Sequence, residues 1–237
     1  MALYDIAGLC VSMNAGGRTL RQAEKYLSND QNKTPDIEIN VNKQRIENAK
    51  KDHPELDEND WEYLLTGSDF YTYLLDFDGM LLHSSCVVVD GFAYLFSADS
   101  GTGKSTHTNL WLEKFKGKAY ILNDDKPAIR KIDGKIYACG TPWSGKYDIS
   151  QPKIVPIAAI ALLERSETNY IKLAETKKGV FTIFSQTVRR LNKEHINKLF
   201  DNVEMLFQNI PIYEFGCNIS QDAVDVAYNT MKPKFDK

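Results

Sequence analysis

The residues of this 237-residue chain with the most evident chemistry form one glycine-rich stretch. It reads Ser97-Ala98-Asp99-Ser100-Gly101-Thr102-Gly103-Lys104-Ser105-Thr106. An apolar run at 92–96 leads into the stretch, and a helix-like run at 107–115 leaves it. Strand, glycine-rich loop and helix in this order are the context of a phosphate-binding P-loop. Glycines let successive backbone N–H groups point at phosphate oxygens, and the helix N-terminus adds positive charge.

The loop pattern predicts a role for its individual residues. Lys104 would place its ammonium beside the transferred phosphate, and the Ser105 hydroxyl would bind Mg²⁺. The residues expected to bind the nucleotide are Ser100, Gly101, Thr102, Gly103, Lys104, Ser105 and Thr106. The pattern G-x-x-x-x-G-K-S has a glycine where this chain has Ala98, and an alanine fits the turn if its φ is negative. The alternative is a loop that has this composition by chance and binds no phosphate. The position of the loop between a strand and a helix disfavours this alternative.

A second chemical element is the tandem pair Asp124-Asp125, which follows the apolar run at 121–122 downstream of Lys104. P-loop enzymes take a second Mg²⁺ contact from an acid at the end of a strand. Adjacent side chains of an extended segment point to different sides, so one aspartate could bind the metal while the other accepts a proton. We assign the metal to Asp125 and the acid–base role to Asp124, although the sequence does not decide between them. A solvated acidic turn before Pro127 is the alternative.

His83 is the third candidate, because it lies on the apolar run 80–89. If Asp90-Gly91 is a hairpin turn, this run pairs with the strand that leads into the loop. The pairing would bring His83 to the end of the strand where phosphates bind. A histidine packed in the core by hydrogen bonds is the alternative interpretation.

Two further segments have weaker claims to function. The loop 140–146 contains Trp143 and Lys146 between glycines, and it could contact an acceptor or simply cover the surface. Either Arg189 or Arg190 could bind the γ-phosphate in the transition state. The alternative for the arginines is a favourable interaction with the dipole of a preceding helix.

Taken together, His83, the glycine-rich loop and Asn123-Asp124-Asp125 resemble the catalytic domain of HPr kinase/phosphorylase. They are also similar to the nucleotide core of ATP-dependent phosphoenolpyruvate carboxykinase. Both families have a histidine on the strand before the loop, an S-G-x-G-K-[ST] loop and a tandem Asp-Asp. The resemblance covers about residues 80–130. It implies that His83 lies near the γ-phosphate or metal, that Ser105 and Asp125 bind Mg²⁺ and that Asp124 is the acid–base residue.

The same resemblance also has limits. The chain is too short for a complete carboxykinase, and it has no recognisable counterpart of the N-terminal domain of HPr kinase. We therefore expect a shorter HPr-kinase-related protein that acts on an acceptor of its own.

The elements that must position these residues are mostly strands. Three Asp-Gly pairs separate apolar runs and predict two-residue hairpins; they are Asp78-Gly79, Asp90-Gly91 and Asp133-Gly134. The runs expected to pair in antiparallel fashion are 71–77, 80–89, 92–96, 128–132 and 136–139. Further strands are expected at 157–163 and 212–215, and helices at 180–188, 193–207 and after Ser220. The predicted fold is α/β, with the P-loop in a mixed, largely antiparallel sheet with flanking helices, as in the two families.

No linker divides the chain, so we expect a single kinase-like domain over 1–237. Residues 1–70 would be an N-terminal extension packed on a nucleotide-binding core at 71–237. An early strand is expected at 6–13, and the charge-rich segment 43–58 would be a solvated helix or a mobile surface segment.

The composition restricts the class of protein. Hydrophobic residues make up 43% and charged residues 26%, which is typical of a soluble globular protein. The formal net charge of −3 gives no basic surface for nucleic acid, and no apolar run approaches the roughly 20 residues that span a bilayer. The four cysteines have no metal-binding spacing. We expect a cytoplasmic protein without nucleic-acid or membrane partners. The sequence does not decide its oligomeric state, and a homo-oligomer is one of the alternatives.

The predicted function is an ATP- and Mg²⁺-dependent kinase that phosphorylates a hydroxyl of a small molecule or of a protein Ser or Thr. A nucleotide-sensing module and a simple P-loop ATPase are the alternatives. The tandem aspartates favour the enzyme, since nucleotide binding alone needs no base. The sequence does not specify the acceptor, the choice of ATP over GTP or reversal of the reaction.

Overall fold

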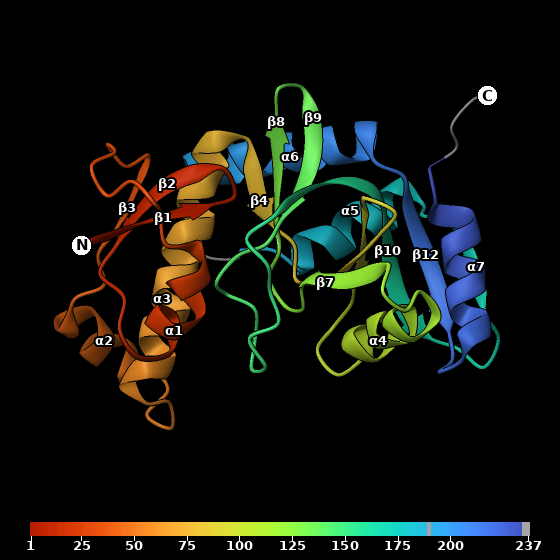
Figure 1. Ribbon diagram of the computed structural model, residues 1–237, viewed down its shortest axis with the longest axis horizontal. Helices are drawn as coiled ribbons and strands as arrows, with labels where there is room; N and C mark the ends of the chain where they lie inside the picture. The colour runs from red at the N-terminus through yellow and green to blue at the C-terminus, as the bar shows by residue number, and fades with distance from the viewer. Residues whose placement is uncertain (189–190, 234–237) are drawn as a thin grey trace.

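The computed structural model describes residues 1–188 and 191–233, which form a mixed α/β structure around one large curled sheet (Figure 1). Within these residues the sheet has nine strands, in the order β4-β8-β9-β10-β6-β5-β7, with β12 on β10 and β11 on β12. The strands are β4 (Gly79–Leu81), β5 (Ser84–Val89), β6 (Phe92–Ser97), β7 (Ala119–Asn123), β8 (Ala128–Ile132), β9 (Lys135–Cys139), β10 (Ile154–Arg165), β11 (Tyr170–Leu173) and β12 (Ile212–Cys217).

The sheet is largely antiparallel, which confirms the predicted fold class. Strand β10 pairs in parallel with β6 and β12, and the other ladders of this sheet in the described chain are antiparallel. The turn Asp90-Gly91 joins β5 to β6, and Asp133-Gly134 joins β8 to β9. All four turn residues have a positive φ between 48° and 81°, which is the geometry of a type I′ hairpin.

The third pair, Asp78-Gly79, ends a helix instead, so the strand expected at 71–77 is wrong. Helix α3 (Glu58–Tyr73) continues into the 3-10 helix η2 (Leu74–Phe77), and Asp78 closes it in the left-handed region, with φ 51°. The residues that α3 buries recur at helical spacing: Tyr63, Thr66, Gly67, Phe70 and Tyr71. Buried residues three and four positions apart form one face of a helix. The packing of this face outweighs the strand propensity of the aromatic residues in 71–77.

The run 80–89 is two strands and not one. Strand β4 pairs with β8, whereas β5 pairs with β6 and β7. His83 lies in the short connection between β4 and β5, not on a strand as expected, and its N–H donates to the carbonyl of Gln186 at 2.8 Å. The chain leaves the ladder here because β4 and β5 belong to different parts of the curled sheet.

Helices cover both faces of the sheet. On one face lie α4 (Lys104–Lys114) and α7 (Gln221–Met231), and on the other α5 (Thr176–Ser185) and α6 (Lys193–Asn209). Strand β5 is buried on both sides: its Val87 belongs to the α4–α7 core and its Val88 to the α5–α6 core. The helices predicted near α5 and α6 are confirmed. Ser220 caps α7 as expected, because its hydroxyl accepts the Ala223 N–H.

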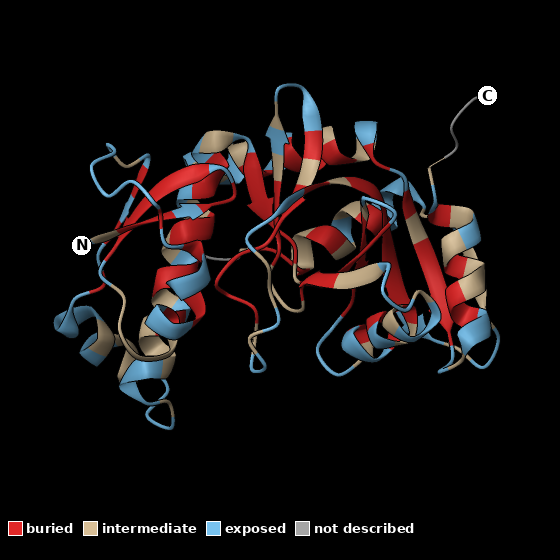
Figure 2. Cartoon of the chain, in the orientation of Figure 1, coloured by how far each residue is buried: buried red, intermediate tan, exposed pale blue. Residues whose placement is uncertain are grey.

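Residues before η2 form a smaller unit beside the main sheet, at the left of Figure 1. Three strands, β1 (Ala2–Ile6), β2 (Leu9–Met13) and β3 (Ile37–Ile39), accompany α1 (Gly17–Ala23), the 3-10 helix η1 (Glu24–Tyr26) and α2 (Lys43–Lys50). The strand expected at 6–13 is interrupted by a turn at Ala7-Gly8, both with positive φ. Helix α2 buries no residue and is the solvated helix that the charges suggested (Figure 2).

This unit and the main sheet share one apolar cluster. The cluster joins Tyr63, Phe70 and Tyr71 of α3 to Leu81, Ala128, Cys139 and Trp143 of the larger part. In the described residues no helix is both long and apolar enough to cross a bilayer.

Candidate active site at the glycine-rich loop

The glycine-rich loop connects the end of β6 at Ser97 to the start of α4 at Lys104. Gly101 and Gly103 have φ values of 79° and 122°, which L side chains rarely adopt. A Cβ built on either glycine would meet no atom within 4 Å, so backbone conformation rather than space requires glycine here. Ala98 is not among the described residues with positive φ, which satisfies the condition for alanine at that position.

Lys104 is buried beneath its own loop. Its Nζ donates to the carbonyl oxygens of Ala98 at 2.8 Å and Asp99 at 3.3 Å. Burial lowers the pKa of Lys104, although the carboxylates of Asp125, Asp124 and Asp99 act in the opposite direction. The ammonium is therefore held by main-chain carbonyls of the loop, and three acidic side chains act on it electrostatically.

The loop, His83 and the acidic pair line one cavity of about 300 Å³. Its lining residues are His83, Ser100, Gly101, Gly103, Lys104, Ser105, Thr106, Asp124 and Asp125. The structure thus brings together the residues that the sequence singled out, with one exception. Thr102 lines the two neighbouring cavities instead.

Asp124 is connected to the loop helix through two buried hydroxyls. Ser85 donates to Asp124 Oδ1 at 2.5 Å, and the Ser85 and Thr108 hydroxyl oxygens are 2.8 Å apart. Thr108 lies on α4, one turn after Lys104, and donates to the Lys104 carbonyl at 3.3 Å. Sequence reasoning missed this connection, whose signal was the polar pair Ser84-Ser85 inside an apolar strand.

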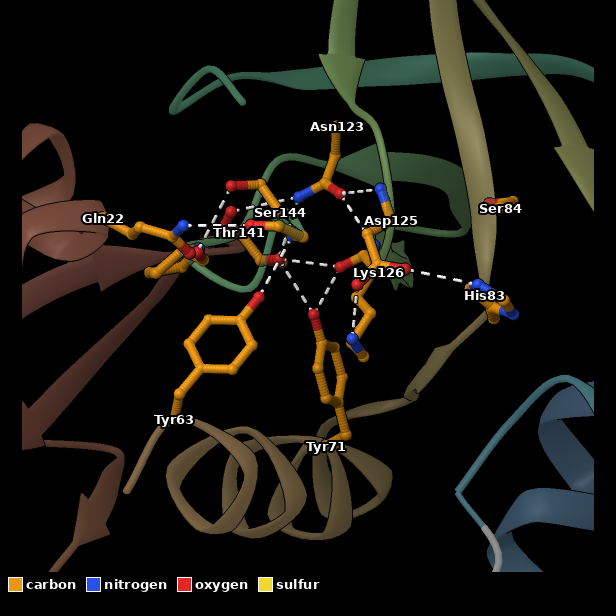
Figure 3. A network of polar contacts seen from close by, with 12 residues as sticks. Gln22, Tyr63, Tyr71, His83, Ser84, Asn123, Asp125, Lys126, Thr141 and Ser144 are labelled. Carbon is orange, nitrogen blue, oxygen red and sulfur yellow. Dashed lines mark hydrogen bonds and ion pairs between the residues drawn. The ribbon is translucent and has the colours of Figure 1, made fainter. Parts of the chain in front are cut away.

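Asp125 contacts two potentially cationic side chains (Figure 3). His83 Nε2 is 3.2 Å from Asp125 Oδ1, and Lys126 Nζ donates to Oδ2. Burial alone would raise the pKa of this carboxyl. The hydrogen bond with His83 and the charge of Lys126 outweigh burial and lower the pKa to about 2. Asp125 is therefore an anion at neutral pH, as a cation ligand should be.

The turn that presents the acidic pair is shaped by Asn123. Its buried side-chain oxygen accepts the N–H groups of Asp125 at 3.0 Å and Lys126 at 2.8 Å. Its Nδ2 donates to the Thr141 carbonyl at 3.0 Å. An Asx turn of this kind directs Asp124 and Asp125 to the different partners described above.

Gln186 joins His83 to the loop, a role that sequence reasoning did not assign. Its Oε1 is 2.9 Å from His83 Nδ1, and its Nε2 donates to Asp99 Oδ1 at 2.7 Å. An amide oxygen only accepts, so His83 Nδ1 carries a hydrogen and Nε2 faces Asp125. Arg189 and Arg190, weighed as phosphate ligands, lie outside the described residues.

Two larger cavities flank the loop. One of about 640 Å³ lies between the loop and α5, and one of about 670 Å³ lies between the loop, α4 and the segment after β12. Arg165 lines both, and it donates to the carbonyls of Gly101 at 2.6 Å and Thr102 at 3.1 Å. Either cavity has the volume for a nucleoside, and both adjoin the loop.

The residues present fit a Mg²⁺ ion that arrives with a nucleotide. In the described part of the chain no three His, Cys, Asp or Glu side chains are grouped as a metal site. Mg²⁺ in phosphate-transfer sites is bound by one or two carboxylates together with phosphates and water. Ser105 and Asp125, which line the same cavity, provide the hydroxyl and the carboxylate of such a site.

Comparison with known proteins adds little to this geometry. No family model matches the chain, and no curated protein matches it. One solved structure of similar fold is the HPr(Ser) kinase/phosphatase from Coxiella burnetii, at 9% sequence identity and a TM-score of 0.37. The similarity covers 63% of this chain and 95% of the other. This is a distant likeness of fold, and the function must be argued from the site.

Proposed function

We propose that this protein is an ATP- and Mg²⁺-dependent kinase that transfers the γ-phosphoryl group to a hydroxyl of a small molecule or of a protein Ser or Thr. One observation carries the proposal. A P-loop with a buried lysine, a histidine and two adjacent carboxylates line a single cavity of about 300 Å³. Phosphoryl transfer needs positioning and electrostatic stabilisation rather than covalent chemistry by the protein, and these residues provide both.

The nucleotide would be bound mainly by main-chain groups. The N–H groups of 101–105 and the N-terminus of α4 would hold the phosphates, with the Lys104 ammonium placed at the transferred group. Ser105 and Asp125 would bind Mg²⁺, which when present neutralises charge between the β- and γ-phosphates. His83, held by Gln186, would contact the γ-phosphate in the same cavity.

Asp124 would orient the acceptor hydroxyl and take its proton. As the acceptor oxygen forms its bond to the γ-phosphorus, the bond from that phosphorus to the β,γ-bridging oxygen breaks. Ser85 holds one carboxylate oxygen of Asp124, and no described side chain hydrogen-bonds the other. Asp124 lines the cavity, where this second oxygen would accept the proton.

The test is incubation of the purified protein with γ-labelled ATP, Mg²⁺ and a cell extract. A kinase yields a labelled metabolite or a labelled protein, and Lys104→Ala removes that label. Release of free phosphate with no labelled acceptor would indicate an ATPase. Nucleotide binding without loss of the γ-phosphate would indicate a sensing module, and either result would contradict the proposal.

A further inference from the structure

A second, smaller cavity lies next to the phosphate cavity. It has a volume of about 240 Å³ and is mainly apolar. Three aromatic residues line it: Tyr63 and Tyr71 from α3, and Trp143 from the loop after β9. Leu81 and Lys126 complete the side that faces the phosphate cavity.

Two chain segments border both cavities. Each contributes one residue to the apolar cavity and, within two positions, another to the phosphate cavity: Leu81 and His83, and Lys126 and Asp125. A third residue of the apolar cavity, Val188, is two positions from Gln186, which hydrogen-bonds His83. The apolar cavity therefore adjoins the segments that carry His83 and Asp125 into the phosphate cavity.

Hydrogen bonds to the rest of the protein fix the two tyrosines of this aromatic wall (Figure 3). The Tyr71 hydroxyl contacts the Lys126 carbonyl and lies 2.9 Å from Thr141 Oγ1. The Tyr63 hydroxyl accepts the Gly145 N–H at 3.1 Å. Both phenol groups are engaged by the protein, and the rings form a nearly fully buried, apolar floor of the cavity.

Trp143 is fixed as firmly against α3. Its ring stacks on Phe70 with centroids 4.8 Å apart, and its Nε1 donates to Thr66 at 3.3 Å. Gly67 makes this contact feasible, because a Cβ at that position would lie 2.8 Å from Trp143 Cδ1. A preformed, largely apolar hollow with few polar groups is typical of a small-molecule site.

We propose that this cavity, the acceptor pocket, binds the apolar ring of a small hydroxyl-bearing acceptor and directs its hydroxyl at the phosphate cavity. The inference rests on the proposed kinase function. The volume is below the roughly 300–1,000 Å³ of sites for drug-sized ligands, so it suits one ring. Lys126 is already paired with Asp125, so the bound group is neutral. An aryl-alkyl alcohol has this chemistry.

A direct binding measurement tests the pocket without nucleotide. The probe is 3-phenylpropan-1-ol, with glycerol as a polar control, and the readout is the indole N–H resonance of Trp143. Trp111, a buried residue of α4, is the internal reference. We expect a saturable shift of the Trp143 resonance with phenylpropanol alone, with Trp111 unmoved. No saturable shift, or an equal response to glycerol, would overturn the inference.

A steric variant provides an independent test. Ser68 is exposed on α3 at the mouth of the pocket, so Ser68→Phe should block access without disturbing the core. We expect phenylpropanol affinity to fall about tenfold or more, and the KM of the acceptor to rise while ATP binding stays unchanged. Glu58→Phe, exposed on the first turn of α3, is the matched control. Equal effects of the two variants would refute the assignment.

These experiments separate the pocket from the kinase activity. Binding of phenylpropanol at Trp143 without phosphate transfer to any hydroxyl supports the pocket and contradicts the kinase. Transfer to phenylpropanol that Ser68→Phe does not alter supports the kinase and overturns the acceptor pocket.

Discussion

Asp124 and Asp125 are adjacent in sequence but have different surroundings, and this difference predicts different mutant behaviour. Asp124→Asn removes the proton acceptor while the loop and Lys104 remain. We expect kcat to fall about 10²- to 10⁴-fold, with ATP affinity nearly unchanged. The measurements are transfer rates with γ-labelled ATP and the Kd of ATP by calorimetry. Normal transfer by Asp124→Asn would show that the base is another group.

Asp125→Asn is expected to act through Mg²⁺ instead. Its carboxylate is the one kept ionised by His83 and Lys126, so its loss should raise the Mg²⁺ concentration needed for half-maximal transfer. Titration of the rate with Mg²⁺ for both variants distinguishes the two roles. If Asp124→Asn shows the larger change in Mg²⁺ requirement, the roles of the two aspartates are exchanged.

The low pKa of Asp125 also predicts a pH-dependent contribution to stability. The pKa falls from the ordinary 3.8 to about 2 on folding, so the charged carboxylate stabilises the fold above about pH 4. That contribution is lost as the pH falls through about 2. At about 1.4 kcal/mol per pKa unit it amounts to roughly 2 kcal/mol.

Urea unfolding at pH 7 and at pH 2 measures this contribution. Asp125→Asn should have a lower free energy of unfolding than the parent protein at pH 7. The difference in this free energy between the two proteins should be smaller at pH 2. Asp133→Asn is the control, because Asp133 is exposed in a hairpin whose left-handed conformation asparagine tolerates. A difference for Asp125→Asn that does not change with pH would contradict the linkage.

At the scale of the elements, the glycine-rich loop offers a matched pair of substitutions. Gly103 and Gly117 both have a positive φ and open space where a Cβ would lie. Alanine at either position should cost about 1 kcal/mol of stability from backbone strain. Only Gly103→Ala should also weaken ATP binding, because Gly103 lines the phosphate cavity. An equal loss of ATP affinity in Gly117→Ala would mean that the effect is one of stability alone.

The elements also show how far the sequence could predict this structure. Asp90-Gly91 and Asp133-Gly134 were predicted correctly as hairpins, because an apolar run lies on each side of each turn. For Asp78-Gly79 the hairpin prediction was wrong, since the same dipeptide can also end a helix. The local pattern does not show whether the residues before it form a strand or a helix. The decision comes from α3 packing its Phe70 and Tyr71 on Trp143, a contact distant in sequence.

The residues of the candidate site could also be predicted only in part. Lys104, Ser105, Asp124 and Asp125 could be found because short-range spacing carries the P-loop pattern. Gln186 could not be given a role, since it meets His83 across 103 positions of the chain and no local motif marks that contact. His83 was expected at the site through strand pairing. It lies there because the chain turns between β4 and β5 and hydrogen-bonds Gln186.

For the whole molecule, the shared apolar cluster makes the smaller N-terminal unit part of the site. Helix α3 supplies Tyr63 and Tyr71 to the acceptor pocket, while the main sheet supplies the loop and the acidic pair. Acceptor choice and phosphate transfer would thus be encoded in different parts of the chain. Such an arrangement requires that the two parts stay fixed against each other.

This requirement predicts that the two parts unfold together. Trp61 on α3 and Trp111 on α4 report on the smaller unit and the main sheet. In the unaltered protein, the folded-state indole N–H resonances of Trp61 and Trp111 should disappear with the same urea midpoint and m-value. The physical reason is the cluster around Trp143 and Phe70, whose burial is lost if either part opens. Separate midpoints for the two resonances would show that α3 can leave the main sheet while the nucleotide site persists, and the acceptor pocket would then have no fixed wall.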